Sequence, residues 1–402
     1  MSTMTSRRPL VRRLPWAWIF GLGIPLLIFI RIFYLVSVTE QRDLAFFVGA
    51  AVQSLQLGSL YALIALGYTM VYGIIRLINF AHGEVFMVGA FTSYFLFSGA
   101  PFALPWALLW AAVLGWGVMF VLNLWRGRMN DPVVLGGGLL AFASFAAVLS
   151  ATSISWWAAL VMSMLSTGVL GVVIDRIAYR PLRGAPRISL LITAIAVSFF
   201  LQNTGLIVFT RNQTPFRPET QWTQFLQFDV MGGTVYTSRL MFLIPVLTAI
   251  LVIGLTLFVT RTRLGKAMRA SAQDAEVAQM MGVNVNRVIA TTFLLGSMLA
   301  AAGGVLWGLN FGSLNQPAVL GILPGIKAFA AAVIGGIGSL PGAVIGGVLL
   351  GFLENFMTAL FPRTPTFPGI TEYKDTFAFA LLIIVLLIRP SGIVGEDLSE
   401  KV

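Results

Sequence analysis

The run LMFLIPVLTAILVIGLTLFV, residues Leu240–Val259, contains no charged side chain. An α-helix rises about 1.5 Å per residue, so a run of about 20 residues crosses the roughly 30 Å hydrocarbon core of a bilayer. Lipid offers the backbone no hydrogen-bond partners, so only helices and closed barrels can span it. The run is uninterrupted and lacks the period-2 alternation of a barrel strand. It therefore predicts a transmembrane α-helix.

The composition of the whole chain extends this prediction. Of the 402 residues, 58% are hydrophobic and 10% are charged, and the mean hydropathy is +0.89. An average soluble domain is about a quarter charged, and surface scaling limits the apolar share that a soluble core can hide. The remaining apolar surface must therefore face lipid.

Apolar runs recur along the chain and set the expected fold. Besides the quoted run, they lie at about Val48–Ile75, Val85–Phe97, Phe102–Leu124, Val133–Ala151, Trp156–Ile174, Ile188–Phe209, Val288–Leu309, Ile322–Ile337, Gly342–Leu360 and Phe377–Ile388. Several are shorter than the roughly 20 residues that a full span needs, so some are expected to be half-membrane or broken helices. The sequence predicts an all-α, polytopic transmembrane helical bundle of about 10 spans.

Short basic clusters between the apolar runs predict the orientation, because Lys and Arg concentrate in cytoplasmic loops. The clusters are Arg126/Arg128, Arg176/Arg180/Arg183/Arg187 and Arg261/Arg263/Lys266/Arg269/Arg287. All of them can be placed on one side, the cytoplasm. In a bacterial inner membrane, this arrangement puts both termini on the cytoplasmic side. It puts the loops Arg211–Arg239 and Phe361–Asp375 on the outer side.

The N-terminus carries four arginines before the apolar run Trp16–Ile30. That pattern resembles a signal peptide, but no small-residue cleavage site follows, so an uncleaved anchor helix is expected. The predicted division is a cytoplasmic tail and anchor over residues 1–45, a transmembrane domain over residues 46–389, and a cytoplasmic tail over residues 390–402.

Several functional classes are disfavoured by the residues that are few or absent. The chain has no cysteine and one histidine, His82, so neither a disulfide framework nor a metal centre is expected. The basic residues form no patch for nucleic acid. The sequence has no Walker A motif, so any ATP must be bound by another chain, and no cofactor is expected here. No nucleophile motif is present and acids and bases are few, so the chain is not expected to be an enzyme.

The first informative motif is INFAHGE, residues Ile78–Glu84, where one apolar run ends and another begins. Asn79, His82 and Glu84 cannot all face lipid, because ionisable groups at depth normally face the bundle interior or water. One interpretation is a broken-helix turn at Asn79, His82, Gly83 and Glu84 that lines a solute path. The other is an interfacial turn in which Asn79 and His82 cap helix ends. The sequence leaves both open.

The second motif is the charged segment Thr260–Arg287, TRTRLGKAMRASAQDAEVAQMMGVNVNR. Apolar residues recur at steps of three or four, with the charged residues off this stripe, which predicts a cytoplasmic amphipathic helix. Such a helix could lie on anionic lipid. Acidic residues in its second half and the glycine stop at Gly282 favour docking to a protein partner.

The third motif is rich in glycine. It includes Gly335, Gly336, Gly338, Pro341, Gly342 and Gly346. Glycines four residues apart share a helix face and allow a neighbouring backbone to approach closely. Tight helix packing is one interpretation, and a mobile break at Gly335–Gly342 is another, because Pro341 removes a donor.

Together these motifs resemble the permease subunits of bacterial ABC importers for leucine, isoleucine and valine. The resemblance runs from about Gln53 to the C-terminus. Its blocks are Gly58–Glu84, Tyr179–Arg183, Phe200–Asn203, Arg263–Gly282, Lys327–Gly347, Glu372–Asp375 and Pro390–Ile393. Urea and short-chain amide importers use very similar permeases, so these substrates stay open.

The resemblance implies a membrane heterodimer with a second, related permease, two cytoplasmic ATPase subunits that bind ATP, and a soluble solute-binding protein outside. The family's coupling helix would fall on Glu276–Gly282, with Glu276, Ala278, Gly282 and the nearby Arg269 in contact with an ATPase. Val277 departs from the family pattern E-A-A-x-x-x-G. A longer stretch within about residues 100–155 is expected to be an inserted helical hairpin.

An ATP-independent secondary transporter or channel is the alternative function. Ion-coupled carriers usually place carboxylates deep in their spans. Here Asp175, Glu354 and Asp375 are predicted near helix ends, and only Glu84 is ambiguous. The sequence therefore favours an ATP-driven importer.

Overall fold

The computed structural model of the chain describes residues 24–38, 43–98, 104–126, 131–150, 154–217, 222, 224–230, 233–362 and 369–395. Its α-helices are α2 (Ile24–Phe33), α3 (Leu44–Ile75), α4 (His82–Ser98), α5 (Leu104–Arg126), α6 (Pro132–Ser150), α7 (Trp156–Ile174), α8 (Arg187–Val208), α9 (Leu240–Arg261), α10 (Arg263–Gln273), α11 (Ala275–Met280), α12 (Val285–Phe311), α13 (Pro317–Gly335), α14 (Leu340–Leu360) and α15 (Lys374–Ile388). Short π- and 3₁₀-helices are η3 (Tyr34–Val38), η4 (Asp175–Tyr179), η5 (Arg180–Leu182) and η7 (Thr371–Tyr373).

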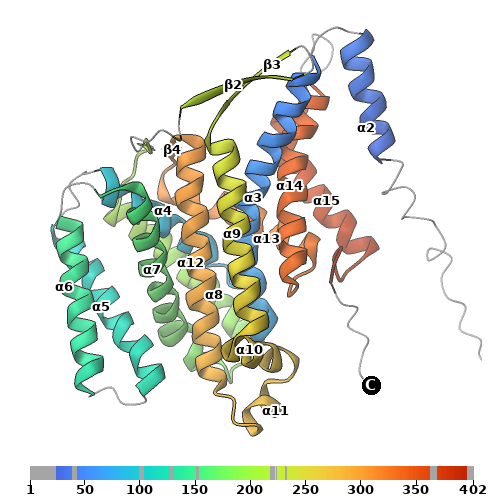
Figure 1. Ribbon diagram of the computed structural model, residues 1–402. Coiled ribbons are helices and arrows are strands. Elements are labelled where there is room, and N and C mark those ends of the chain that lie inside the picture. Colours follow the sequence, from blue (N-terminus) through green and yellow to red (C-terminus); the bar gives the residue numbers. More distant parts are fainter. Residues whose placement is uncertain are drawn as a thin grey trace, which may run out of the picture.

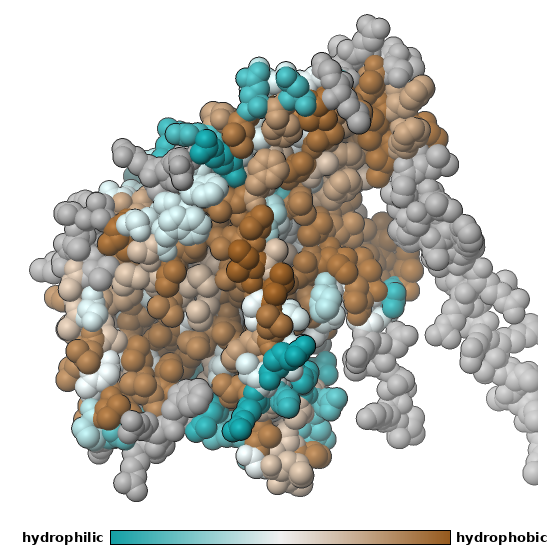
Figure 2. Space-filling view, viewed as in Figure 1, coloured by the Kyte–Doolittle hydropathy of each residue, from teal (hydrophilic) through white to brown (hydrophobic). Residues whose placement is uncertain are grey.

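Seven of the described helices are long and apolar enough to cross a membrane, and three shorter apolar segments accompany them. The prediction of an all-α transmembrane bundle is confirmed. Figure 2 shows the apolar surface as a belt between two more polar ends. Helices α8 and α9 carry many exposed aliphatic and aromatic side chains on this belt, as expected for surfaces that meet lipid or another transmembrane chain.

Helix α3 is 32 residues long and forms the centre of the bundle (Figure 1). It packs most extensively against α14 and also against α12 and α13. Helix α12 in turn packs against α7 and α4. Helices α5 and α6 pack against each other as a hairpin at the edge, and α5 also contacts α7. That hairpin falls within the stretch that the sequence interprets as inserted.

Glycines allow α3 and α14 to pack with their backbones close together. A Cβ atom at Gly351 would lie 2.2 Å from the backbone nitrogen of Gly58, and one at Gly347 would lie 2.5 Å from that of Ala62. Contacts under about 3 Å exclude any side chain, so this interface requires glycine on α14. The central core therefore forms around α3.

The two ends of the bundle carry different structures. At one end, strands β2 (Phe225–Val230) and β3 (Gly233–Ser238) form an antiparallel hairpin next to the start of α3. Strand β1 (Thr214–Pro215) pairs there with β4 (Ser313–Leu314). At the opposite end lie α10 and α11 (Figure 1). The sequence predicted only a loop at Arg211–Arg239, whereas the structure forms β1, β2 and β3 there. In β2, exposed and half-buried residues alternate, as they do along a strand with one face packed.

The chain termini are only partly described. Helix α2 covers the second half of the predicted anchor run Trp16–Ile30, and the first half lies outside the described residues. Near the other terminus, the backbone N–H groups of Ile393 and Val394 donate to the carbonyls of Ile334 and Gly335, both at 2.9 Å. The segment Ser391–Gly395 therefore packs beneath the turn between α13 and α14.

Candidate functional site

The INFAHGE motif forms an inset turn between α3 and α4. Helix α3 ends at Ile75, and Arg76 caps it in the left-handed conformation, with φ 52°. Helix α4 begins at His82, whose ring abuts Gly67, so that a Cβ there would lie 2.1 Å from His82 Nε2. Gly67 lies eight residues before the end of α3, or about 12 Å along its axis. Helix α4 therefore begins inside the bundle rather than at its end.

The polar residues of this turn are buried. Asn79, His82 and Glu84 have relative exposures of 3%, 1% and 1%. Asn79 Oδ1 accepts a hydrogen bond of 2.6 Å from the hydroxyl of Tyr179, and the His82 ring packs edge-on against Tyr68, with centroids 4.7 Å apart. This geometry corresponds to the broken-helix interpretation, since a turn at a water interface would expose these groups.

Glu84 lies in the first turn of α4 and lines a cavity of about 400 Å³. None of the described residues donates a hydrogen bond to Glu84 Oε2. Ser198 and Tyr68 are the other polar side chains of the lining, and the rest is glycine or apolar. The first backbone N–H groups of a helix lack helical partners and carry partial positive charge. The cavity thus presents a carboxylate and a helix N-terminus to an otherwise apolar space.

A second cavity, of about 700 Å³, opens at the hairpin end between α3, α12, α13 and α14. Sequence analysis considered Glu354 and Asp375 only as groups near helix ends and did not predict that they meet Lys327. The Lys327 ammonium forms an ion pair with the Glu354 carboxylate and a second one, 2.7 Å long, with Asp375 Oδ1. The Tyr61 hydroxyl donates a hydrogen bond of 2.8 Å to Glu354 Oε2. Lys327 and Glu354 are 8% and 3% exposed, so this cluster is inside the bundle.

The sequence predicted Glu354 near a helix end, but its carboxylate is buried inside the bundle. Glu354 lies in α14 on the same face as Gly347 and Gly351, which pack on α3, so the helix turns its carboxylate inward. The sequence did hold one signal, because Lys327 lies within an apolar run. An ionisable group there normally pairs inside the bundle or faces a water-filled path.

Helix α13 separates the two cavities. Leu320, Pro324 and Lys327 line the larger cavity, whereas Gly321 and Gly325 line the smaller one. Pro324 lies inside the helix and has no N–H, so the carbonyl of Leu320 lacks its helical partner. The wall between the cavities is therefore a helix with a weakened hydrogen-bond ladder.

The glycine-rich motif contains the turn between α13 and α14. Helix α13 ends at Gly335. In the turn that follows, Gly336 has a φ of 111° and Gly338 a φ of 99°, and Pro341 occupies the first turn of α14. Side chains at Gly342 and Gly346 would collide with α13, where a Cβ at Gly346 would lie 2.0 Å from the carbonyl oxygen of Ala331. The structure thus shows both close packing and a break between helices.

The charged segment forms two helices, α10 and α11, so the prediction of one continuous helix is wrong at Asp274. The Asp274 carboxylate accepts hydrogen bonds from the backbone N–H groups of Glu276 and Val277, at 2.9 and 3.0 Å. Asp is a favourable N-cap, and a cap residue has extended rather than helical dihedrals. Asp274 therefore ends α10 and starts α11.

The predicted coupling residues take different positions on this segment. Ala278 is buried, Glu276 is exposed in the first turn of α11, and Gly282 ends the helix with φ 84°. Arg269 is exposed and donates a hydrogen bond to the carbonyl of Val259 at the end of α9. Met280 and Met281 are 84% and 81% exposed. The end of α11 thus exposes two apolar side chains, Met280 and Met281, near the acidic side chain of Glu276.

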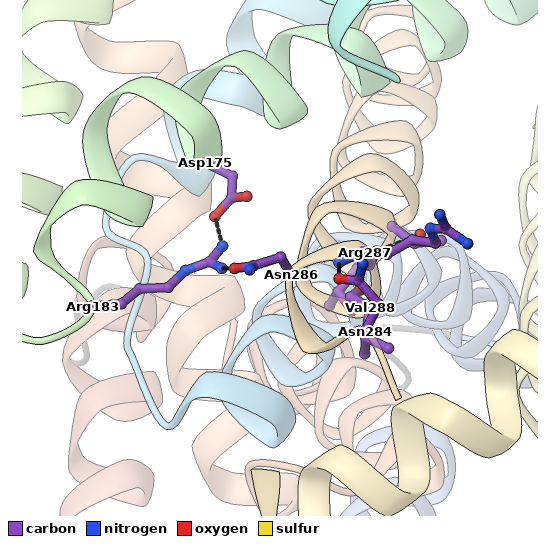
Figure 3. Close-up of polar contacts among 8 residues, drawn as sticks. Asp175, Arg183, Asn284, Asn286, Arg287 and Val288 are labelled. Carbon is purple, nitrogen blue, oxygen red and sulfur yellow. Dashed lines mark hydrogen bonds and ion pairs between the residues drawn. The ribbon is translucent and has the colours of Figure 1, made fainter. Parts of the chain in front are cut away.

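A group of polar contacts around Arg183 lies at the start of α12, the helix that follows α11 (Figure 3). Arg183 Nη2 forms an ion pair of 2.5 Å with Asp175 Oδ1, and Nη1 donates to Asn286 Oδ1, also at 2.5 Å. Asn284 caps the start of α12 by accepting from the backbone N–H of Arg287. Arg183 therefore joins the end of α7 to the start of α12, directly after the α11 tip.

The described residues contain no group of three or more His, Cys, Asp or Glu side chains that could hold a metal ion.

Comparison with known proteins gives concordant matches. A sequence model of the family described as "Branched-chain amino acid transport system / permease component" matches residues 50–135 and 133–386. The high-affinity branched-chain amino acid transport system permease protein BraD of Pseudomonas aeruginosa is 41% identical over 351 residues, covering 87% of this chain and 96% of that protein. The corresponding permease LivH of Escherichia coli K12 is 39% identical over 348 residues, covering 86% and 94%. A probable branched-chain amino acid permease of Methanocaldococcus jannaschii is 33% identical over 172 residues, covering 43% and 52%.

Proposed function

This chain belongs to the family of branched-chain amino acid transport permeases, and we propose that it forms the transmembrane path of an ATP-driven importer for leucine, isoleucine and valine. The observation that carries the proposal is its 41% identity, over 87% of the chain, to a permease of that activity. The bundle of seven long apolar helices supports it. We place the protein in the bacterial inner membrane with α10 and α11 in the cytoplasm.

The smaller, mostly apolar cavity is suited to the path. A branched-chain amino acid combines an aliphatic side chain with an ammonium and a carboxylate group, so it needs mostly apolar walls with a few polar partners. In the smaller cavity, Glu84 would meet the ammonium group and the N–H groups at the start of α4 would meet the carboxylate. Asn79, His82 and Gly83 hold this helix start in place.

The partners follow from the two ends. We propose that the tip of α11 docks in a groove of one ATPase subunit, since Met280 and Met281 are exposed and flexible apolar side chains suit such contacts. A soluble binding protein would deliver solute at the hairpin end, where the larger cavity opens. A second, related permease would complete the membrane part, and another ATPase subunit would serve it.

Reconstitution tests the function. The chain is co-expressed with the permease, ATPases and binding protein encoded beside it and placed in proteoliposomes. We expect uptake of labelled leucine that requires ATP on the α11 side and binding protein on the hairpin side. Uptake driven by a proton or sodium gradient without the ATPases would contradict the proposal and indicate a secondary transporter. Uptake of urea or acetamide, but not of leucine, would show that the substrate is urea or a short-chain amide instead of a branched-chain amino acid.

Cysteine cross-linking tests the docking of α11. The chain has no native cysteine, so a Met280→Cys variant carries one thiol. We expect it to cross-link to cysteines placed along the groove of an ATPase subunit, whereas the control Asn212→Cys, exposed just before strand β1, does not. A Met280→Lys variant should assemble yet lose several-fold in uptake, because a charge replaces the apolar contact. Wild-type uptake with Met280→Lys and no cross-link would refute this docking site.

A further inference from the structure

The cluster of Lys327, Glu354, Asp375 and Tyr61 has a chemistry that the path proposed above leaves unused. Three helices and the start of a fourth bring it together. Tyr61 comes from α3, Lys327 from α13, Glu354 from α14 and Asp375 from the first turn of α15. All four side chains line the cavity of about 700 Å³. A volume of that order is typical of sites for small molecules.

The charges that line this cavity are two lysine ammonium groups and two carboxylates. Lys327 lies between two carboxylates, those of Glu354 and Asp375, and pairs with both. Glu354 is 3% exposed, so its charge depends on Lys327 and on the hydroxyl of Tyr61. Buried ion pairs contribute little net stability because desolvation offsets their attraction. Lys374 lines the same cavity from the exposed start of α15 and adds a second cation, so a solute that carries one charge of each sign keeps the charges in balance.

We propose that Lys327 and Glu354 bind a zwitterionic amino acid in this cavity, with Lys327 on its carboxylate and Glu354 on its ammonium group. The proposal rests on the function proposed above and deepens it. A zwitterion that enters between the two side chains gives each buried charge a new opposite partner, so no charge is left unpaired. Asp375, at the more exposed edge of the cluster, would attract the ammonium group first.

One part of the remaining wall fits the aliphatic part of such a solute, and the rest carries polar side chains such as Gln53, Gln56 and Asn310. Leu57, Trp307, Leu320 and Leu323 line the same cavity. Urea or a simple amide carries no charges, so it would separate Lys327 from Glu354 without replacing either partner. Leaving a buried charge unpaired costs far more than a neutral hydrogen bond returns. The site therefore selects for zwitterions and against neutral amides.

Variants in the complete reconstituted transporter test the site. Lys327→Met leaves the buried Glu354 carboxylate without its cation, so this change alone could also disturb folding, whereas in Glu354→Gln the Lys327 ammonium keeps Asp375 as its partner. The double variant Lys327→Met/Glu354→Gln leaves no buried charge unpaired, because Asp375, which also loses Lys327, has a side chain that is 47% exposed. The new amide can still accept the Tyr61 hydrogen bond. We expect the double variant to assemble and to lose at least about tenfold in maximal leucine uptake per complex, the scale of one lost charge contact.

A purely structural ion pair predicts a different result, because removing both charges together would then leave uptake near the wild-type rate. That outcome would overturn the proposal. The wild-type transporter separates this failure from failure of the proposed function. If the wild type does not import leucine, the function is wrong, whereas import by both proteins at equal rates makes only this site wrong.

Thiol protection decides the question without charge variants. Leu323 lines the cavity and is 51% exposed, so Leu323→Cys places a single thiol there. We expect saturating leucine to slow its reaction with a small maleimide at least several-fold, and acetamide to have no effect. The control Asn212→Cys, exposed just before strand β1 and outside the lining, should react at one rate throughout. An unchanged rate at Leu323→Cys with saturating leucine would refute binding in this cavity.

Discussion

The phenol of Tyr179 donates a hydrogen bond of 2.6 Å to the side-chain oxygen of Asn79. Tyr179 ends η4, directly after α7, and Asn79 lies in the turn that precedes α4. The Tyr179 ring also packs against Phe293 of α12, with centroids 5.5 Å apart. This bond thus connects the helix start that holds Glu84 to the helices that carry the Arg183 bridge.

A Tyr179→Phe variant should be less stable by about 1–3 kcal/mol, because the buried Asn79 oxygen, 3% exposed, would lose its donor. The ring packing would be kept, so the loss reports the hydrogen bond. The measurement is the melting temperature of the purified complex in detergent. A matched control is Tyr236→Phe, in which the affected ring is 66% exposed, and no change is expected there. Equal melting temperatures for all three proteins would contradict this account.

The contact between α3 and α14 predicts a difference between two glycines. In Gly351→Ala the new Cβ would meet the backbone of Gly58 at 2.2 Å, whereas in Gly254→Ala, on α9, it would meet nothing within 4 Å. Forcing an extra carbon into a close-packed contact costs about 1–3 kcal/mol. We expect Gly351→Ala to lower the yield of folded protein and its melting temperature, and Gly254→Ala to leave both unchanged. Similar effects of the two changes would mean that α3 and α14 are not so close.

The helices could largely be predicted from apolar runs, because lipid requires long uninterrupted segments. The predicted run Trp156–Ile174 coincides with α7. Helix α13 was expected to begin at Ile322 but begins at Pro317. Proline is well tolerated in the first turn of a helix, where the missing N–H has no partner anyway. Pro324 inside the same helix obscured its start further.

The candidate sites were only partly predictable, because they depend on which helices pack together. The INFAHGE turn could be recognised because its polar residues, Asn79, His82 and Glu84, lie within six residues of one another. Lys327 and Glu354 are on separate helices, and they meet because α13 and α14 pack against each other after the turn at Gly336–Ser339. No local pattern contains that pairing. Asp274 could have been recognised as an N-cap within the charged segment, since Asp is favoured there.

Glu84 predicts an effect on transport without one on assembly. Its carboxylate lies in an apolar cavity and Oε2 has no hydrogen-bond partner among the described residues, so neutralisation should not disturb folding. In the reconstituted transporter, Glu84→Gln should move leucine several-fold more slowly at saturating binding protein, because the ammonium group would lose its anionic partner. Glu84→Asp keeps the charge and should retain more activity. If Glu84→Gln transports at the wild-type rate per assembled complex, this turn is structural only.

The bridge from Arg183 to Asp175 and Asn286 predicts a non-additive pair of changes. The Asp175 side chain is 4% exposed and pairs with Arg183 Nη2, so Arg183→Ala strands a buried carboxylate and should cost about 3–5 kcal/mol. Asp175→Asn in the same chain removes that charge, so the double variant should be more stable than Arg183→Ala alone. Both variants also lose the hydrogen bond from Arg183 to Asn286 at the start of α12, the helix that directly follows the α11 tip. We therefore expect the double variant to hydrolyse ATP but to import less leucine per ATP than the wild type. Melting temperatures and uptake per hydrolysed ATP measure the two effects separately. Additive losses of stability would show that Asp175 does not depend on Arg183, and normal coupling in the double variant would show that the bridge does not transmit movement from α11 to the bundle.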